Sequence, residues 1–381
     1  MEQQEKKVEY VELIYDLIFV YIVGRNNGLL HHLKNGFIAP SAFLTYILTA
    51  LIMLQIWYYT TLFINRYGKN DLLMHGGIFV NMYLLYYMAE GIRSDWQGHY
   101  LYFNIAWALI LINIAVMYLI RLKKGDAAKP WENEQIKRNI FVIIIQVVMI
   151  LVSVPVFFAT DIPLSPLAMV FGIIMAITCR RVNQLAPVEF GHLTERVMLF
   201  VVFTFGEMII GISEYFDGGF NFTTVYFSLF AFLIVVGLFT SYGLMYDHII
   251  DREMTTNGTA YMMLHVFLIL SLNHITAALE FMQEEEVADL PKNLFLTGSF
   301  AMFFILMYLI MLCGTSSCKP GRTVNLQLIA ATAAFIVIML LTYRLPYLSI
   351  VMTLVYIISF YLILFRLWRK NGCCEESKKT E

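Results

Sequence analysis

The chain has 381 residues, of which 59% are hydrophobic and 14% are charged, and its formal net charge is -2. A soluble domain carries about 25% charged residues, so this composition excludes an ordinary soluble protein. Apolar runs of roughly 20 residues recur along the whole chain, and each is long enough to cross a hydrocarbon layer of about 30 Å. We therefore expect an all-α, polytopic membrane helix bundle.

Taken in chain order, the apolar runs predict about twelve transmembrane helices joined by short loops. The only sizeable loop covers residues 121–138, and no cleavable signal peptide precedes the first run. The predicted spans are 10–31, 38–64, 72–92, 99–120, 139–160, 165–182, 195–213, 222–246, 259–281, 293–313, 324–343 and 346–367.

The orientation of these spans follows from their basic residues, which gather in the cytoplasmic loops of membrane proteins. With the N-terminus placed in the cytoplasm, that side receives nearly all of the 26 lysine and arginine residues. The exceptions are Arg25, Lys34, Arg93, Lys292 and Arg344. Because the number of spans is even, we expect both the N- and the C-terminus in the cytoplasm.

The two halves of the chain, 1–190 and 191–381, resemble each other weakly. A shift of 190 residues places His75 on His265, and it also aligns two copies of the tetrapeptide MYLI. Six spans in each half give both halves one orientation, a layout known among transporters. We therefore predict two six-helix repeats in parallel orientation.

Glu207 is the most unusual residue of the seventh span. It follows Glu195 by twelve residues, or about 18 Å of helix, and so falls near mid-membrane, where a charge costs about 2.5–3.5 kcal/mol. Gly206 beside it favours close approach of another helix. Gly24 and Arg25 occupy the equivalent depth of the first span. This predicts an Arg25–Glu207 pair, either within a transport path or as a structural link.

Three further polar positions each allow two interpretations. Asp16 shares a helix face with Glu12, as an inward functional group or as an interfacial acid that reaches water or an arginine. His265 is a proton relay or a hydrogen-bonded packing residue. Asp247, in the stretch 247–253, suits either a metal site or a charged helix end; we favour the helix end and expect no metal.

Several motifs resemble those of a known family, the bacterial low temperature requirement A proteins. The resemblance rests on VELIYDLIFV, TTLFINR, HLTERVMLFVVFTFGE, YDHIID and AYMMLH, in that order between residues 8 and 281. It implies a multi-pass protein of the bacterial cytoplasmic membrane, named for a role in growth in the cold, with no settled biochemical activity. The family's motif positions correspond here to Glu12, Asp16, Glu195, Arg196, Gly206, Glu207, Asp247 and His265.

Two residues depart from the pattern of that family. Its members usually carry a small hydroxyl residue where this chain has Met208. Its first span usually continues with neutral polar residues and a histidine, whereas this chain reads VGRNNGLLHH and includes Arg25.

Three functions are compatible with these features. The first is an ion- or proton-linked secondary transporter or channel for ions or a small solute, with Glu207 central and Asp16 and Glu195–Arg196 at the cytoplasmic mouth. The second is a non-transporting envelope protein that binds lipid or a partner. The weakest is an enzyme that modifies lipid headgroups, so we expect no enzyme.

The expected partners are membrane lipid and protons or small ions. The sequence lacks the phosphate-binding motif G-x-x-x-x-G-K-[ST] and a soluble basic patch with interleaved aromatic residues. We therefore expect no nucleotide motor, no nucleic acid and no cofactor, and the sequence leaves the substrate and the oligomeric state open.

Overall fold

The computed structural model describes residues 7–92, 96–125, 130–178, 187–216, 219–314 and 319–371, so both chain ends lie outside the described residues. Within these ranges the chain is almost entirely helical, which confirms the all-α class. The α-helices are α1 (Tyr10–Asn27), α2 (Pro40–Tyr67), α3 (Leu72–Glu90), α4 (Trp96–Lys123), α5 (Pro130–Thr160), α6 (Pro166–Thr178), α8 (Phe190–Ser213), α9 (Phe222–His248), α10 (Thr259–Phe281), α11 (Asp289–Gly314), α12 (Arg322–Thr342) and α13 (Pro346–Asn371).

Ten of the described helices are long and apolar enough to cross a membrane. The two others, α1 and α6, also correspond to predicted spans, but α1 has a larger share of charged residues than the ten and α6 is shorter than they are. Helix α1 carries three charged residues, Glu12, Asp16 and Arg25. Helix α6 has 13 residues, or about 20 Å of helix, which is shorter than the hydrocarbon layer. The chain is thus a polytopic membrane bundle with two atypical helices.

Local sequence explains where many helices begin. Proline occupies the first position of α2, α5, α6 and α13, where its missing N–H group costs no helical hydrogen bond. Asp71 caps α3 by accepting a hydrogen bond from the backbone N–H of Met74 at 3.0 Å. Asn221 caps α9 in the same way, accepting from Thr224 at 2.9 Å. These side chains satisfy backbone donors that a helix start leaves unpaired.

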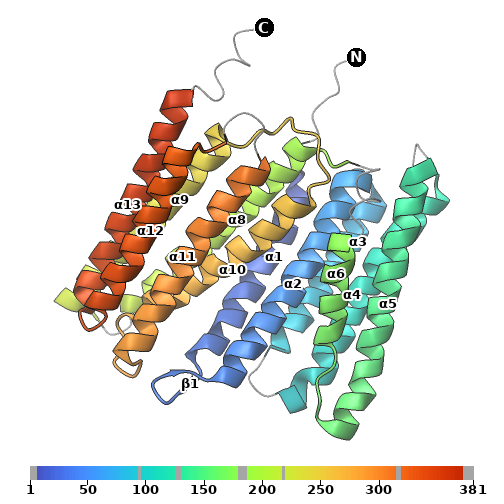
Figure 1. The fold of residues 1–381 in the computed structure, drawn as a ribbon. Coiled ribbons are helices and arrows are strands. Elements are labelled where there is room, and N and C mark those ends of the chain that lie inside the picture. Colours follow the sequence, from blue (N-terminus) through green and yellow to red (C-terminus); the bar gives the residue numbers. More distant parts are fainter. Residues whose placement is uncertain are drawn as a thin grey trace. The chain divides into compact units, whose positions relative to one another are not determined.

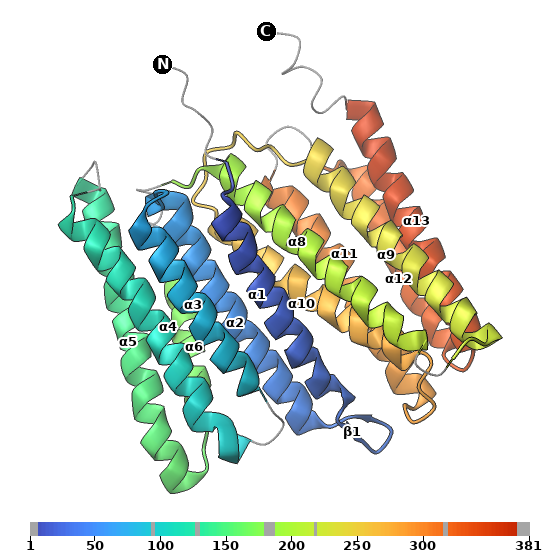
Figure 2. The ribbon, with the colours of Figure 1, turned by 180° about the vertical axis from the view of Figure 1, so that it is seen from behind.

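The chain folds as two compact units. The first contains α1 to α6, α8 as far as Phe200, and residues 255–262. In this unit α4 packs between α3 and α5, while α1 contacts α2 and α3 (Figures 1 and 2). Helix α2 is the most enclosed, since 78% of its apolar stretch is buried. It therefore forms the centre of the first unit.

The second unit contains residues 33–37, α8 from Val201, α9, most of α10, and α11 to α13. Helix α13 packs against α9 and α12, and α11 contacts α12 (Figure 1). Helix α10 is the most enclosed of this unit, whereas only 17% of the apolar stretch of α12 is buried. The predicted boundary after residue 190 lies ten residues before α8 passes from the first unit to the second.

A small β-hairpin, absent from the sequence-based expectations, joins α1 and α2. Its strands are β1 (Leu33–Lys34) and β2 (Phe37–Ile38). Between them, Asn35 and Gly36 have φ angles of 54° and 78°, the backbone that an Asn-Gly hairpin turn requires. The carbonyl of Gly36 accepts from the N–H of Ala288 at 2.8 Å, which fixes the turn within the second unit.

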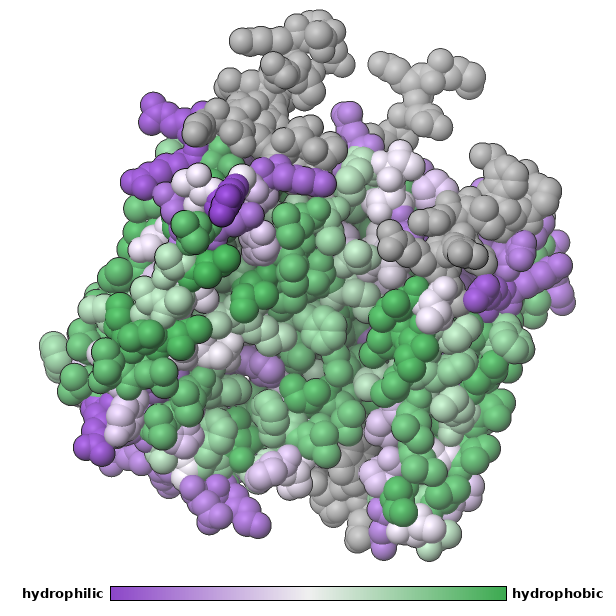
Figure 3. Space-filling model, viewed as in Figure 1, coloured by the Kyte–Doolittle hydropathy of each residue, from purple (hydrophilic) through white to green (hydrophobic). Residues whose placement is uncertain are grey.

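The outward-facing side chains of the helices are largely apolar. On α9 they form a stripe at helical spacing, comprising Val225, Leu229, Phe232, Val236 and Phe239, each 40–53% exposed. Hydrophobic residues cover the middles of the helices, and hydrophilic residues gather near the helix ends (Figure 3). A soluble protein rarely exposes such a surface, so these faces suit contact with lipid.

Candidate functional site

A cluster of buried charges connects α1 and α8 inside the first unit. Arg196 on α8 donates from Nη1 to Oε2 of Glu12 at 2.9 Å. It also donates to both oxygens of Asp16, from Nη2 at 3.1 Å and from Nε at 3.4 Å. All three residues have 0% exposure to solvent. One guanidinium group thus bridges two carboxylates, with the two-pronged geometry at Asp16 that arginine favours.

Two matching spacings bring these groups together. Glu12 and Asp16 lie four residues apart on α1, and His192 and Arg196 lie four residues apart on α8. Residues at this spacing share one face of a helix. The acidic face of α1 therefore meets the basic face of α8. We call Glu12, Asp16, His192 and Arg196 the charge cluster.

Hydrogen bonds determine which tautomer His192 adopts when its ring is neutral. The Asn65 side chain accepts from the backbone N–H of Glu189 at 3.1 Å and donates from Nδ2 to the carbonyl of the same residue at 3.0 Å. These two bonds identify which side-chain atom of Asn65 is the amide nitrogen. That nitrogen, Nδ2, also lies 3.0 Å from Nδ1 of His192. Nδ1 must accept there, so the proton of a neutral His192 is on Nε2.

The proton on Nε2 of His192 faces a carboxylate of the cluster. Nε2 lies 3.4 Å from Oε1 of Glu12, but the angles are not those of a hydrogen bond. The contact is therefore electrostatic. Nδ1 faces the amide nitrogen of Asn65, which donates there.

Aromatic residues complete the enclosure of the cluster. Trp57 donates from Nε1 to Oδ1 of Asp16 at 2.9 Å, and its ring lies 4.6 Å from that of Phe200. Trp57 is fully buried. Beside it, the hydroxyl of Tyr15 contacts that of Thr60 at 3.0 Å. Asp16 therefore accepts hydrogen bonds in an environment without direct access to water.

The cluster carries more negative than positive charge. With both carboxylates ionised, one guanidinium faces two anions, so Glu12, Asp16 and Arg196 together carry one net negative charge. Burying a charge costs several kcal/mol unless it is paired. The arrangement can therefore hold one more positive charge, either a proton on a carboxylate or a small cation.

The structure gives Arg25 a partner other than the predicted Glu207. Its guanidinium lies 3.5 Å from Oε2 of Glu90, and both side chains are more than 40% exposed. Glu90 also accepts from the hydroxyl of Tyr21 at 3.1 Å. Arg25 is therefore part of a surface ion pair within the first unit, since its long side chain reaches the end of α3. Gly24, its neighbour in α1, is half-buried.

Glu207 lies on the part of α8 that belongs to the second unit, and it is half-buried. A Cβ atom added to Gly206 would meet no atom within 4 Å, in contrast to the close packing expected there. Gly206 faces outward instead. The close-packed glycine of this helix is Gly211, where a Cβ atom would lie 2.5 Å from Oε1 of Glu280.

The other predicted residues lie apart from the charge cluster. Glu195 is half-buried and forms no hydrogen bond or ion pair with the described residues. His265 is fully buried in the second unit, where its Nε2 lies 3.2 Å from the hydroxyl of Tyr242. Asp247 is a surface residue that pairs with Arg252 at 3.2 Å. In the described part of the chain, no three His, Cys, Asp or Glu residues gather as a metal site would require.

The sequence placed Asp16 and Arg196 at the same cytoplasmic mouth but did not predict that Arg196 binds both Glu12 and Asp16. The roles of His192 and Asn65 were missed. The available signal was the four-residue spacing in HLTER, which matches that of Glu12 and Asp16. Periodicity shows that two residues share a face, but it does not show which helices meet.

Comparison with known proteins agrees with the motifs that form the cluster. Residues 7–358 match the family described as Bacterial low temperature requirement A protein (LtrA), which is nearly the whole chain. The chain belongs to the LtrA family. No curated protein shows significant similarity to it. In this LtrA protein, the sequence motifs around Asp16 and Arg196 supply the two sides of one buried ion cluster.

Proposed function

We propose that this LtrA protein is a secondary transporter or channel whose ion movement is linked to protonation or cation binding in the charge cluster. The observation that carries the proposal is the pairing of two fully buried carboxylates, Glu12 and Asp16, with a single guanidinium. Since the sequence contains no nucleotide-binding motor motif, transport would draw on an ion gradient.

The two carboxylates have different roles in this proposal. Asp16 accepts from two nitrogens of Arg196 and from Trp57, so it is the more firmly held anion. Glu12 accepts from Nη1 of Arg196 and, weakly, from the backbone N–H of Glu9 at 3.5 Å, and it lies in the first turn of α1, close to the helix end. Glu12 is therefore the proposed site of the exchangeable proton or cation, and Asp16 keeps Arg196 in place.

Glu207 remains a second candidate for the ion path. It follows Arg196 by eleven residues on α8, or about 16 Å along the helix axis. Arg25, His265 and Asp247 are weaker candidates, because their described contacts are also those of structural or surface groups. Glu195 is weaker as well, since it is half-buried and outside the charge cluster.

The test is ion flux in proteoliposomes. Purified protein is placed under imposed proton, sodium or potassium gradients, and a pH dye and a potential dye report flux. We expect flux in the wild type and its loss in Glu12→Gln, with folding confirmed by size-exclusion chromatography. Glu285→Gln, a charge change at an exposed loop residue, serves as the control. Equal flux in wild type and Glu12→Gln contradicts the assignment of Glu12.

A second candidate function, lipid binding without transport, is favoured by a different observation. An apolar cavity of about 340 Å³ lies between α11, α12 and α13 in the second unit, lined among others by Phe304, Leu328, Ile336 and Phe360. This volume lies within the range of pockets that hold small ligands. Absence of flux under every gradient, together with lipid retention that Ala333→Phe abolishes, would replace transport by lipid binding.

A further inference from the structure

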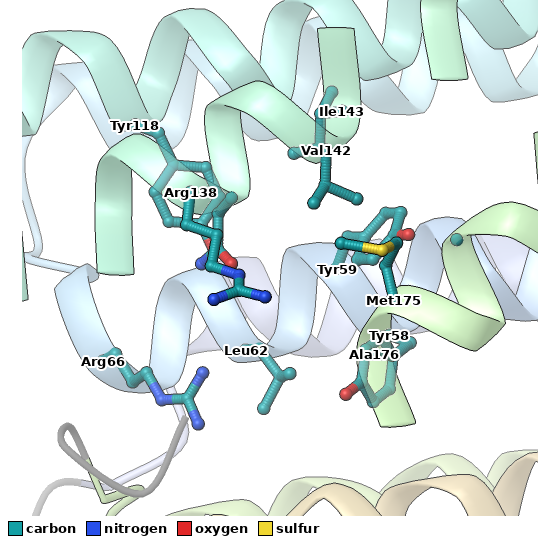
Figure 4. A pocket seen from close by; sticks show the side chains of 12 residues that line it. Tyr58, Tyr59, Leu62, Arg66, Tyr118, Arg138, Val142, Ile143, Met175 and Ala176 are labelled. Atoms are coloured by element: carbon teal, nitrogen blue, oxygen red, sulfur yellow. The ribbon is translucent and has the colours of Figure 1, made fainter. Parts of the chain in front are cut away.

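A second polar feature of the first unit lies outside the charge cluster. It is a cavity of about 40 Å³ between α2, α4, α5 and α6. A cavity needs roughly 10–15 Å³ per water molecule on this measure, so there is room for about three oxygen atoms. Figure 4 shows that Arg66 and Arg138 both point toward the space beside Leu62. We call this space the arginine cavity.

The arginine cavity is chemically suited to an anion. Arg66 from α2 and Arg138 from α5 contribute two positive charges, and no acidic residue is found among its described lining. Guanidinium groups bind phosphate oxygens through paired hydrogen bonds, which makes arginine the preferred residue for this ligand. Two such groups beside one small cavity create a positive potential that favours an anion there.

Arg66 has an unused hydrogen-bond donor at this place. Its Nη2 donates to the carbonyl of Asn257 at 3.2 Å. Its Nε is buried and has no hydrogen-bond partner among the described residues. Leaving a buried donor unsatisfied costs about 1–3 kcal/mol, and more on a charged group. This independent observation points to a ligand that accepts hydrogen bonds.

Tyr118 on α4 supplies a further donor. Asn139 donates to its hydroxyl oxygen at 3.3 Å, so the hydroxyl acts as an acceptor there. Its own proton is directed to no acceptor in the described part of the chain. Since Tyr118 lines the cavity, its O–H group is available to a ligand oxygen. The cavity thus combines two cations with a neutral donor.

The other residues that line the arginine cavity are mostly apolar, which indicates that the ligand carries an apolar part. Leu62, Val142, Ile143, Met175 and Ala176 line the same cavity. Arg66 and Tyr118 lie near the ends of their helices, and Arg138 near the start of α5. These ends are the ones that the distribution of basic residues assigns to the cytoplasm. Basic pockets between helices at that depth suit anionic lipid headgroups.

We propose that the arginine cavity binds a phosphate group, held by Arg66, Arg138 and Tyr118. Its two chemical sources are an anionic phospholipid, whose chains would follow the apolar wall, and free inorganic phosphate. This proposal is independent of the transport function, since it involves none of the residues of the charge cluster.

The experiment measures lipid retention by the purified full-length chain. Detergent-solubilised protein is incubated with phosphatidylglycerol or with phosphatidylcholine of the same acyl chains, washed, and analysed by native mass spectrometry. A parallel arm titrates inorganic phosphate calorimetrically. We expect phosphatidylglycerol to be retained in preference to phosphatidylcholine. Arg66→Gln or Arg138→Gln should weaken its binding on the order of ten- to a hundredfold, as expected for a lost charged hydrogen bond.

Two further variants make the result decisive. Arg322→Gln removes a charge at the exposed start of α12 and should leave retention unchanged. Ala176→Phe fills the cavity without changing its charge, and should reduce retention even if an arginine variant fails to fold. Binding of inorganic phosphate alone, with the same dependence on Arg66, would support the site with a free ion as its ligand. Equal retention in wild type and in both arginine variants would overturn the proposal.

Discussion

Arg196 binds Asp16 through two nitrogens, at 3.1 and 3.4 Å, although 180 residues separate them in the sequence. Both side chains have 0% exposure. The contact therefore joins distant motifs of the chain inside the first unit. Its energy depends on desolvation as much as on attraction, because a buried ion pair recovers only part of the cost of removing its charges from water.

Removal of Arg196 should destabilise the protein strongly. Arg196→Met leaves Glu12 and Asp16 buried without a cation, and removal of one partner of a buried pair costs about 3–5 kcal/mol. Thermal unfolding in detergent, followed by circular dichroism, measures the change. Glu195→Gln is the matched control on the preceding residue and should shift stability by less than about 0.5 kcal/mol. Equal effects of the two substitutions would contradict the described pairing.

The two acids of the charge cluster should respond differently to neutralisation. Glu12→Gln leaves one cation facing one anion, so stability should stay the same or rise. Asp16→Asn removes the carboxylate that accepts from Arg196 and Trp57, and should cost about 1.5–3 kcal/mol, the range for hydrogen bonds to charged groups. Denaturant unfolding of both variants checks the order; a greater loss in Glu12→Gln would contradict it.

The glycines of α8 provide a matched pair of substitutions. Gly206→Ala adds a Cβ atom that meets nothing within 4 Å, so the better helix propensity of alanine should raise stability by up to about 1 kcal/mol. Gly211→Ala places the atom 2.8 Å from Cγ2 of Thr276 and closer to Glu280, and should cost about 1–3 kcal/mol. Melting temperatures in detergent should therefore move in opposite directions, and a shared direction would refute the packing.

Because of Asp71, we expect the first unit to lose stability at acidic pH. Arg121 donates to its two carboxylate oxygens at 2.7 and 2.8 Å. These bonds hold the pKa of Asp71 below its ordinary value, which is about 3.9. A lowered pKa stabilises the fold above the unfolded value, and the contribution disappears as the pH falls through the folded value.

The corresponding variant is Asp71→Asn, which keeps a good helix cap. It should be less stable than wild type at neutral pH by about 1 kcal/mol, a modest figure because the pair is partly exposed. The difference should begin to shrink as the pH falls below about 4, and it should disappear only below the lowered pKa of folded Asp71. Unfolding curves between neutral pH and pH 3 test this, and a difference that stays constant with pH would show that Asp71 is not ionised in the pair.

The sequence was sufficient to predict the membrane class and most helices, because apolar runs of membrane length are a strong local signal. Helices α3, α9 and α10 begin at their predicted first residues and end within two residues of their predicted last residues. The hairpin at Asn35–Gly36 was missed, since two-residue strands leave almost no pattern.

The candidate site was only partly predictable. The i, i+4 relation of Glu12 and Asp16 was visible, but the identity of their partner depends on which helix packs against α1. An alignment of the two halves paired Arg25 with Glu207 by depth alone. Depth in the membrane does not determine which helices lie side by side. In the structure, the carboxylate that lies close to Arg25 is that of Glu90.

The division of the charge cluster between α1 and α8 also has a consequence for biosynthesis. Glu12 and Asp16 leave the ribosome 184 and 180 residues before Arg196. Through that interval α1 carries acids without their guanidinium, and such a segment inserts poorly on its own. We therefore expect α1 to remain at the translocon or the membrane surface until α8 is made, so that α1 settles in the bilayer later than several helices that follow it in the chain.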